Sequence, residues 1–472
     1  MLESSSLVLT FPLFSIFVLE LEFQSEFCRD HIKFVIMVKH IHLEENLHTY
    51  IHLLSKTAKD SKTVIPGLIF GAEISQSKTA IVHMSRTPKE NSDAEPAPIT
   101  VLENIVDASI IEHARQSYRM LPGGLDIVGL FLVTDQDPFS SQYLPRLRKL
   151  LTQINKVVNQ SNKFRNFELH EFVVCHIPTD PHKVVLKTIE VNSISNPKPV
   201  ELKESIPCWA DLNSNVAFEF SFPINGSEHI LKSQLEESLQ KFKSTITNSL
   251  VLLNGSFRKG NELLIEEEKD KKGKKKPKDV EVDPIKVINT ILLIPEMITE
   301  DGCCKTELRM SGTMCTKAYV HHKATVQEAE EVIKEDLLRS LYFRCEMHCD
   351  SLVGDDLRDT MSEDESVLHE PPRRVMINLP YSSHLMICDY LFPGEGSQDS
   401  LSSLADLMDM DCTEGDIQDY WEATYVTDSP PQEAALLSQN EIVQVSHQNW
   451  ANLMLLSVIV LLIAIVFIWI LK

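Results

Sequence analysis

The sequence predicts an α/β fold made of two folded domains, followed by a disordered acidic linker and a single C-terminal transmembrane helix. Short apolar runs bounded by turn residues alternate with helix-periodic segments between residues 37 and 392, as in mixed α/β domains. Residues 393–449 are acidic, and residues 450–471 contain no charged side chain. A chain of 472 residues is long enough for two or three domains of ordinary size.

The first 36 residues are expected to lie outside the fold. The apolar run 7–19 is a poor secretion signal, because no basic residue precedes it, acidic residues follow it and no small-residue cleavage site closes it. Met37 opens a more ordinary start, so residues 1–36 are interpreted as an N-terminal extension. If they did direct secretion, the sequons at Asn225 and Asn254 would become glycosylation candidates.

The first domain is predicted over residues 37–191 and alternates strands with amphipathic helices. Apolar positions recur at helical spacing in the segments 43–54, 102–121 and 144–158. The run Pro122-Gly123-Gly124 ends the second of these helices. The predicted strands are the apolar runs 64–72, 80–84, 126–134, 172–177 and 183–191, of which 126–134 is expected to be covered on both faces.

The second domain is predicted over residues 206–392. Residues 216–223 alternate apolar and polar side chains, which indicates a strand with one solvated face. The charged insert 266–281 contains a lysine-rich run, which fits a solvated loop better than a localisation signal or an anionic-lipid contact because acidic residues flank it. The other predicted elements are helices over 229–250 and 326–349, two strands on either side of the insert, and strands over 310–322, 375–379 and 385–390.

After Gly394 the composition becomes that of a flexible tether, with twelve Asp and Glu and no Lys or Arg up to residue 450. Residues 450–471 would span about 30 Å as a helix, the hydrocarbon thickness of a bilayer. The alternative is a buried core helix, which rarely runs this long without a charge. A span at this end leaves the preceding residues in the cytosol. Its characteristic residues are Trp450 and Trp469 near the two ends, with Leu455, Ile459, Leu462 and Ile465 between them.

The charge balance argues against nucleic acid as the partner. The chain has 45 Lys and Arg against 68 Asp and Glu, a net charge of −23, whereas phosphate backbones require the opposite sign. Ten cysteines occur without the spacing of a disulfide framework. We therefore expect reduced thiols in a cytosolic body.

Two groups of residues are candidates for chemistry, and both have a simpler structural interpretation. Cys345, His348 and Cys349 lie within about one helical turn, but structural zinc needs four ligands and no second pair stands at usable spacing. Cys175 lies near the run Asp180-Pro181-His182, yet neighbouring strand residues offer no helix N-terminus to lower the thiol pKa. The chain also lacks Gly-x-Ser-x-Gly, phosphate-binding and dinucleotide-binding motifs. No catalytic residue, metal or cofactor is therefore expected.

Several blocks of the sequence resemble the odorant-response-abnormal-4 family of tail-anchored proteins. The most specific block begins Glu112-His-Ala-Arg and continues through Pro-Gly-Gly to Val-Gly-Leu-Phe131, and shorter ones are Leu252-Leu-Asn-Gly255, Cys345-Glu-Met347 and Cys388-Asp-Tyr390. The resemblance covers residues 37–392 and the C-terminal span. The family-motif positions are His113, Arg115, Pro122, Gly123, Gly124, Gly129, Cys345, Cys388, Asp389 and Tyr390.

This resemblance implies a single-pass protein of the endoplasmic-reticulum membrane with the bulk of its chain in the cytosol. It implies that the protein assists the folding, exit and ciliary localisation of odorant and other seven-helix receptors. It also implies an architecture similar to the non-catalytic part of the ubiquitin-fold-modifier protease, a cysteine protease that the family is expected to hold at the membrane.

The first domain also resembles a degenerate MPN fold, the fold of the zinc isopeptidases. In active members a strand ending Val-Gly-Trp-Tyr is followed by His-Ser-His, whose imidazoles ligate zinc. The corresponding strand here reads Val128-Gly-Leu-Phe131 and continues with Leu132, Val133 and Thr134, so leucine stands where a ligand is needed. Phe139-Ser-Ser141 retains part of the downstream motif. The resemblance therefore implies a pseudo-enzyme whose surfaces serve binding.

Two functions from different classes remain open at this stage. The first is a non-enzymatic, membrane-tethered adaptor or escort that brings receptors and a partner protein together by confining them. The second is a membrane-tethered peptidase of ubiquitin-like conjugates that acts through Cys175 or an unrecognised metal.

Overall fold

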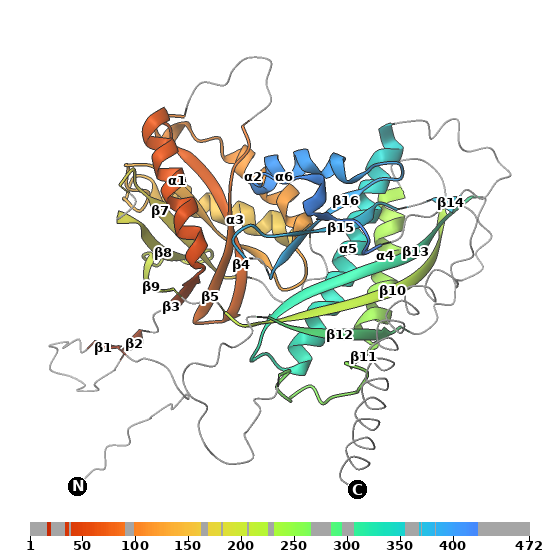
Figure 1. Cartoon of the computed structure of the whole chain (residues 1–472). Helices are drawn as coiled ribbons and strands as arrows, with labels where there is room; N and C mark the ends of the chain where they lie inside the picture. Colours follow the sequence, from red (N-terminus) through yellow and green to blue (C-terminus); the bar gives the residue numbers. More distant parts are fainter. Residues whose placement is uncertain are drawn as a thin grey trace, which may run out of the picture. The chain divides into compact units, whose positions relative to one another are not determined.

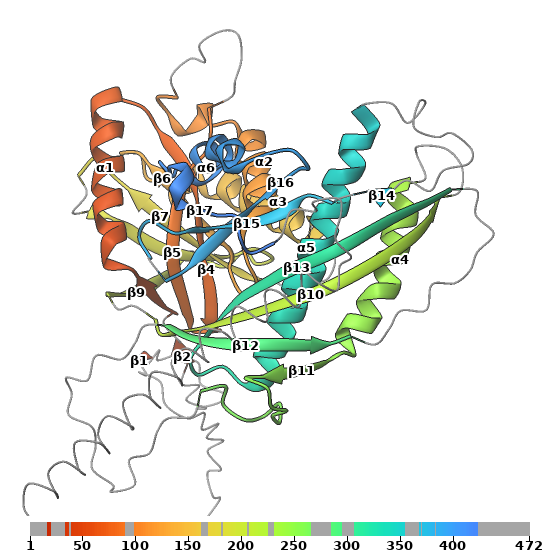
Figure 2. The same ribbon diagram turned by 45° about the vertical axis from the view of Figure 1, so that its right-hand side comes forward.

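A closed β-barrel forms the first part of the fold (Figures 1 and 2). The computed structural model describes residues 17–19, 34–36, 39–89, 99–161, 169–180, 183–204, 207–224, 231–265, 285–294, 306–354, 368–369, 371–382 and 384–422. The barrel strands are, in spatial order, β3 (Lys39–Leu43), β5 (Lys78–Arg86), β4 (Ile65–Ser75), β6 (Asp126–Val133), β7 (Glu171–Ile177), β8 (Val185–Glu190) and β9 (Lys198–Glu204). Parallel pairing of β9 with β3 closes the barrel.

The predicted strands of the first domain are confirmed as β4 to β8. Strand β6 is buried along its whole length, as its apolar sequence requires. Gly129 lies so close to β7 that a Cβ there would stand 1.9 Å from the carbonyl oxygen of Val173. The barrel differs from the prediction at its closing strands, because β3 and β9 carry charged residues in short, mixed sequences that show no clear apolar run. The first structural unit therefore continues past Val191 to Glu204.

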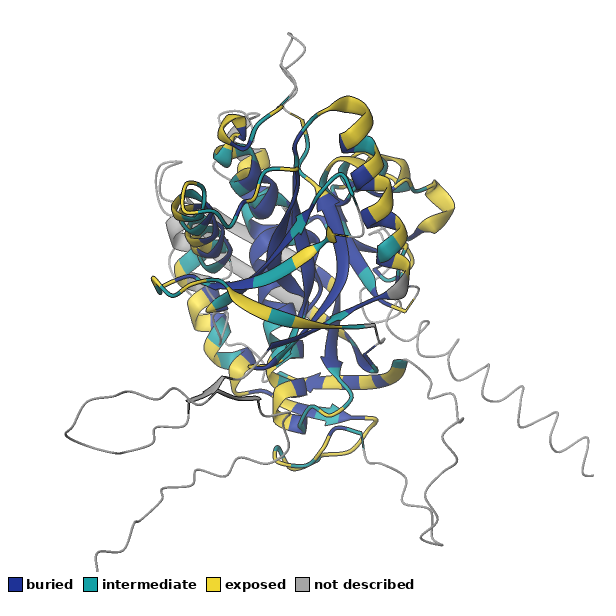
Figure 3. Cartoon of the chain, turned by 90° about the vertical axis from the view of Figure 1, so that its left-hand side faces the viewer, coloured by how far each residue is buried: buried dark blue, intermediate teal, exposed yellow. Residues whose placement is uncertain are grey.

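The helices beside the barrel bury one face each. They are α1 (Glu45–Ser61), α2 (Asp107–Ser117) and α3 (Leu144–Ser161). In Figure 3 helices carry exposed residues on their outer sides, while the strands at the centre of the fold are buried. Helix α3 buries Leu147, Leu151 and Ile154, the apolar positions that predict it. The single helix expected over residues 102–121 is instead α2 flanked by two short 3-10 turns.

The second sheet has the order β11-β12-β10-β13-β14. Its long strands β10 (Trp209–Ile224) and β13 (Thr306–His321) pair antiparallel over their whole lengths. The remaining strands are β11 (Leu250–Leu253), β12 (Ile285–Leu293) and β14 (Leu368–His369), and the helices are α4 (Leu231–Thr247) and α5 (Val326–Gly354). The helices and strands predicted here are confirmed, while the insert 266–281 lies outside the described residues.

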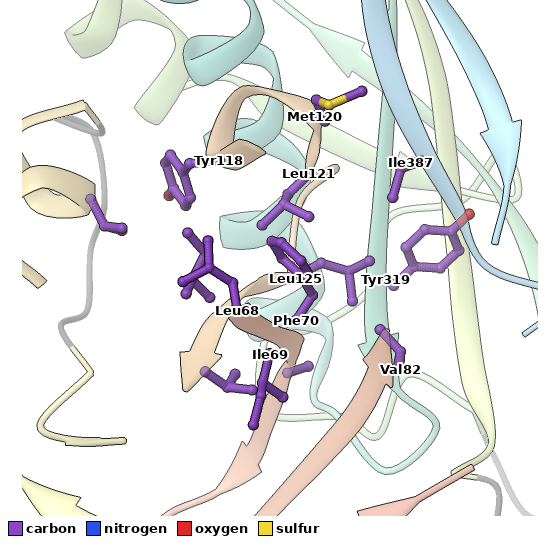
Figure 4. Close-up of a cluster of buried hydrophobic side chains, with 14 of the residues drawn as sticks. Leu68, Ile69, Phe70, Val82, Tyr118, Met120, Leu121, Leu125, Tyr319 and Ile387 are labelled. Atoms are coloured by element: carbon purple, nitrogen blue, oxygen red, sulfur yellow. The ribbon is translucent and has the colours of Figure 1, made fainter. Parts of the chain in front are cut away.

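One core joins the barrel to the second sheet. Figure 4 shows the meeting point, where Val82 of the barrel lies next to Tyr319 of β13, and Leu121 and Leu125 lie between Leu68 and Ile387 of β16 (Met386–Leu391). The residues up to Glu422 group as one compact unit, and residues 423–472 group as another. The two predicted domains thus share a hydrophobic core within the first unit.

Residues 393–422 differ from the predicted linker because they fold back onto the body. Helix α6 (Ser400–Met408) packs on the barrel side, and β17 (Ile417–Gln418) joins β15 (Arg373–Asn378) and β16 in a sheet of order β16-β15-β17. The reason lies in apolar residues spaced among the acidic ones, since Leu404, Met408 and Ile417 are buried. The rest of the predicted linker, 423–449, lies outside the described residues.

Two further predictions fall largely outside the described residues. The predicted membrane span, 450–471, is among the residues that the structure does not describe. No helix in the described part of the chain is long and apolar enough to cross a membrane. Of residues 1–36, the structure describes β1 (Phe17–Leu19) and β2 (Phe34–Ile36), which form an antiparallel pair.

Candidate functional site

The Pro-Gly-Gly loop before β6 is bound directly to the second sheet. The Gly123 N–H donates to the Lys317 carbonyl (2.9 Å) and to Oδ1 of Asp336 (2.8 Å), and the Gly123 carbonyl accepts from the Tyr319 N–H (2.8 Å). Gly124 has φ +79°, and a Cβ there would stand 1.9 Å from the Tyr319 carbonyl oxygen. Both the backbone conformation and the close approach therefore require glycine at this position.

Asp336 of α5 lies at the centre of this contact and is fully buried. Besides the Gly123 N–H, its carboxylate accepts from the Lys317 N–H (2.9 Å) and from both terminal nitrogens of Arg374 (2.7 and 3.1 Å). Burial acts to lower the pKa of Arg374, but the charge and hydrogen bonds of Asp336, together with Cys388 and Tyr390, raise that pKa well above its ordinary value. Arg374 therefore stays charged, paired with a carboxylate whose oxygens are saturated with donors.

Arg344 and Glu422 form a second buried pair. The guanidinium of Arg344, on α5, donates two hydrogen bonds to the carboxylate of Glu422 (2.7 and 2.6 Å), and each side chain is 2% exposed. Glu422 also accepts from the backbone N–H groups of Cys315 and Arg374, both at 2.7 Å. The carboxylate of Glu422, the last described residue, thus accepts four hydrogen bonds, which compensate for the loss of water around a buried charge.

Lys317 of β13 completes the group. Its ammonium contacts both carboxylate oxygens of Asp211 at 3.0 Å and the side-chain oxygen of Asn213 at 2.8 Å, and the Trp421 ring centroid lies 4.9 Å away. Burial raises the pKa of Asp211 even though the charge of Lys317 opposes the rise. We call this set the ionic junction; its members are Asp211, Lys317, Asp336, Arg339, Arg344, Arg374 and Glu422.

The ionic junction links six parts of the chain that are far apart in sequence: the Pro-Gly-Gly loop, β10, β13, α5, β15 and the segment that ends at Glu422. Arg339 adds a bond from α5 to the Leu121 carbonyl, just before the loop (2.7 Å). Each carboxylate of the ionic junction accepts hydrogen bonds from a cationic side chain or from backbone N–H groups. The junction therefore holds these chain segments in place and leaves no carboxylate available for proton transfer. Removing one partner of such a pair leaves an unpaired buried charge, at a cost of about 3 to 5 kcal/mol.

A pair of histidines holds helix α6 against the barrel side. His83 Nε2 donates to the Met408 carbonyl and His113 Nε2 donates to the Leu407 carbonyl, both at 2.7 Å. Burial lowers the pKa of each histidine to about 4. The Nδ1 atoms of both rings are buried without a hydrogen-bond partner, so a second proton would have no acceptor.

Asp409, the residue after α6, strengthens this contact. It pairs with Arg86 of β5 and accepts a hydrogen bond from the Tyr50 hydroxyl of α1. Asp409 has φ +51°, at the end of the helix. The segment 393–422 is therefore fixed near its middle, by the histidines and Asp409, and at its end, by Glu422.

The family-motif positions divide into those at the ionic junction and those elsewhere. Tyr390 donates to Ser340 on α5 (3.1 Å), and Cys388 donates to the Arg119 carbonyl (3.6 Å). Burial raises the pKa of Asp389 to about 6, while bonds from the Tyr390 N–H and from serines of α6 lower it. The positions around the ionic junction are Pro122, Gly123, Gly124, Cys345, Cys388 and Tyr390. The others lie elsewhere: His113 binds α6, Gly129 is part of β6, and Arg115 pairs with Glu112 on the outer side of α2.

The residues considered for catalysis are buried in unreactive surroundings. Cys175 on β7 is 2% exposed, and burial raises the pKa of its thiol to about 12. Burial likewise raises the pKa of Cys345. Pro181 and His182 lie outside the described residues, and the described part of the chain holds no group of three or more His, Cys, Asp or Glu placed to bind a metal ion. A protonated, enclosed thiol is a poor nucleophile.

Sequence reasoning missed the charged members of the junction. Asp336 on α5 and Arg374 on β15 stand next to apolar residues, Leu337 and Val375, and a charge in such a position is the signal that could have marked them. Glu422 carried no such signal, because it follows eight other acidic residues after Gly394.

Comparison with known proteins gives the same family from several sources. The family model described as odorant response abnormal 4-like (ODR4-like) matches residues 67–419. The chain is 29% identical over 377 residues to the protein odr-4 homolog of Xenopus laevis, covering 77% of this chain and 82% of that protein. It is 23% identical over 388 residues to odorant response abnormal protein 4 of Caenorhabditis elegans, covering 78% and 79%. Among solved structures it is similar to UfSP from C. elegans, with a TM-score of 0.40 and 10% identity over 79% of this chain and 57% of that one.

Proposed function

Because this chain belongs to the odorant response abnormal 4-like family, we propose that it serves odorant-receptor function as a non-enzymatic, membrane-tethered adaptor or escort. In this role it promotes the folding, exit and ciliary localisation of odorant and other seven-helix receptors. The observation that carries the proposal is the extent of the family match, residues 67–419, which includes barrel strands β5 to β9, the second sheet and helix α6.

The state of the buried groups supports a binding role over a catalytic one. The charged side chains of the ionic junction are used to hold segments together, and the thiol of Cys175 is enclosed and protonated. The competing proposal, a membrane-tethered peptidase of ubiquitin-like conjugates, would need a thiolate that this environment disfavours. Clients and partners would therefore meet the outer surfaces of the fold.

The barrel fits the proposal as a degenerate MPN-like domain. Leu132 and Thr134, which follow the Val-Gly-Leu-Phe strand, are both buried, and leucine offers no atom to ligate zinc. A domain of this kind would retain the shape of an isopeptidase while serving only as a binding platform.

The proposal places the protein in the endoplasmic-reticulum membrane through residues 450–471, with the bulk of the chain in the cytosol. The uncharged sequence of that segment supports this location. A cysteine protease of a ubiquitin-fold modifier is proposed as a second partner, on the family resemblance alone. At a TM-score of 0.40 the likeness to UfSP adds no support.

The test compares the full chain with a form that lacks residues 450–471 and a form in which an unrelated apolar span replaces them. Each is expressed in cells that lack the endogenous protein, with an odorant receptor whose surface and ciliary fractions are measured. We expect delivery with the full chain and the replaced span, and loss of delivery with the deletion. Normal delivery by the deleted form would refute the tethered escort.

A second measurement separates the escort from the peptidase. The Cys175→Ala variant is compared with the unaltered chain for receptor delivery and for hydrolysis of a ubiquitin-fold-modifier conjugate. The escort predicts equal delivery and no hydrolysis by either protein. Hydrolysis by the unaltered chain that disappears in Cys175→Ala would establish the peptidase instead.

A further inference from the structure

A cavity of about 210 Å³ lies between helix α1 and the barrel. Six of the seven barrel strands contribute to its lining, together with α1. The deepest lining residues are apolar or carry sulfur, and each is at most 4% exposed: Leu43, Ile51, Ile69, Ile81, Met84 and Cys175. The other lining residues are half-buried or exposed, so the cavity reaches from the core to the surface.

Strands β8 and β9 leave the barrel open at this point. Within the described residues they pair at only two positions, at Lys187 and Thr188 of β8. Beyond Lys187 each strand keeps one neighbour, because β8 pairs with β7 and β9 pairs with β3. The antiparallel register of β8 and β9, if continued, would place Val184 opposite Leu202, and both residues line the cavity. The mouth of the cavity therefore lies where these two strands separate.

The lining selects an apolar ligand. Cavities lined by aliphatic side chains stay dry and take up hydrocarbons, because water finds too few hydrogen-bond partners in them. The buried thiol of Cys175 behaves as a small apolar group in such surroundings. A cavity of about 150 Å³ holds benzene, so in proportion one of about 210 Å³ holds about eight carbon atoms. That volume suits a short acyl or alkyl chain.

The mouth supplies polar atoms for one end of such a chain. His48 and His52 lie about one helical turn apart on α1 and both line the cavity, the first half-buried and the second exposed. An imidazole can donate or accept a hydrogen bond, so it suits a carboxylate or a hydroxyl. Charge selects neither of these, because Glu201 and Lys203 beside Leu202 have opposite signs and alternate to the other face of β9.

We propose that this cavity binds a medium-chain fatty acid or fatty alcohol of about eight carbons, with the chain against Cys175 and the polar end at His48 and His52. We call it the acyl cavity. It is separate from the ionic junction, and the inference does not depend on the proposed escort role. Because the ligand contacts α1 and several strands at once, its binding stabilises the barrel.

The test locates the ligand by photo-crosslinking on the full chain in maltoside micelles. The probe is octanoic acid with a diazirine at its methyl end, and labelled residues are identified by mass spectrometry. We expect label in the peptides of β4, β5 and β7, which carry Ile69, Met84 and Cys175. Label confined to other segments would overturn the proposal.

Competition by unlabelled ligands measures the depth of the acyl cavity. Fatty acids of four to twelve carbons compete with the probe, and their free concentrations are corrected for uptake by protein-free micelles. We expect competition to strengthen about fourfold per added methylene up to about eight carbons, and not beyond. Competition that keeps strengthening to twelve carbons would indicate non-specific partitioning and overturn the site. Competition by both octanoate and octanol supports the shared chemistry, and competition by one alone supports the site and identifies the end group.

The decisive variant is Leu202→Trp, because Leu202 is exposed at the mouth and a larger indole closes it. We expect label in the three strands to fall at least about tenfold, in line with the cost of overpacking. Leu53→Trp, at an exposed leucine of α1 that does not line the cavity, is the matched control and should leave labelling unchanged. Unchanged labelling in Leu202→Trp, or equal loss in the control, would overturn the proposal.

The variant His52→Leu tests the polar end, since it places an apolar side chain at an exposed position of the mouth. We expect octanoate to compete at least about threefold less well, as the loss of one hydrogen bond implies, while the same strands are labelled. Unchanged competition by octanoate would overturn the placement of the polar end at the histidines.

Discussion

Arg344 and Glu422 join the middle of α5 to the last described residue through two charge-assisted hydrogen bonds of 2.7 and 2.6 Å. We expect Glu422→Ala to lower the free energy of unfolding by about 3 to 5 kcal/mol, because it leaves Arg344 charged and buried without its partner. Glu414→Ala, at an exposed acidic residue in the same segment, should have almost no effect. Denaturant unfolding of the two variants checks this, and equal midpoints would contradict it.

A double substitution tests whether the pair itself stabilises the fold. Replacing Arg344 by Met and Glu422 by Leu removes both charges and keeps apolar volume at the site. We expect the double variant to recover most of the stability lost in Glu422→Ala, because no unpaired charge remains. A double variant as unstable as the single one would mean that the hydrogen bonds that Glu422 accepts from the Cys315 and Arg374 N–H groups dominate.

Gly124 and Gly255 have nearly the same backbone conformation but different surroundings. Substituting each by alanine distinguishes the cost of the left-handed backbone from the cost of a steric clash with a neighbouring strand. Gly124 has φ +79° and would place a Cβ 1.9 Å from the Tyr319 oxygen, whereas Gly255 has φ +77° with nothing within 4 Å. We expect Gly255→Ala to cost about 1 kcal/mol for the left-handed backbone alone. Gly124→Ala should cost at least about 3 kcal/mol, because it also separates the loop from β13. Equal costs in thermal unfolding would show that the loop contact contributes little.

Acid should weaken the fold through the histidines that hold α6. The folded-state pKa of His83 and His113 is about 4, below the unfolded value of about 6.5, so the unfolded chain binds more protons between these limits. The free energy of unfolding therefore falls as pH drops from 6.5 toward 4, by up to about 1.4 kcal/mol per pH unit for each histidine.

The variant His113→Gln isolates one of the two contributions, because a glutamine amide can still donate to the Leu407 carbonyl without titrating. We expect the pH dependence of its unfolding free energy to be shallower than that of the unaltered chain by about one proton in this range. Denaturant titrations at several pH values provide the measurement, and parallel curves would refute the assignment.

The cysteines should differ sharply in reactivity. Cys175 and Cys315 are buried and their pKa values are raised to about 12, so the thiolate fraction at pH 7.5 is on the order of one part in ten thousand or less. Cys208 is only half-buried. Alkylation of the native protein with iodoacetamide, followed by mass spectrometry, should label Cys208 well before the other two. Early labelling of Cys175 would reopen the peptidase hypothesis.

The elements that sequence reasoning found are those with strong local patterns. Strand β6 was predictable because its apolar run is uninterrupted, and helix α3 because its apolar residues recur at helical spacing. Strands β3 and β9 were not, because the sequences Lys39–Leu43 and Lys198–Glu204 mix charged and apolar residues and owe their conformation to pairing with each other.

The candidate site was less predictable, since its contacts join residues far apart in the chain. Arg344 and Glu422 are 78 positions apart, and Gly123 and Asp336 are 213 apart. No local pattern encodes such pairs. The return of residues 393–422 to the body escaped prediction for the same reason, because their acidic composition is typical of a linker while their few buried side chains depend on distant strands.

The position of Glu422 has a mechanical consequence. Glu422 is the last described residue, so a pull applied to it is transmitted to the body by the bonds of its own side chain. The force first meets the bonds between Glu422 and Arg344, then the two-residue ladder of β17, and only afterwards the contacts of α6. Rupture would thus proceed in sequence from the C-terminal side, and the buried pair would set the load at which it begins.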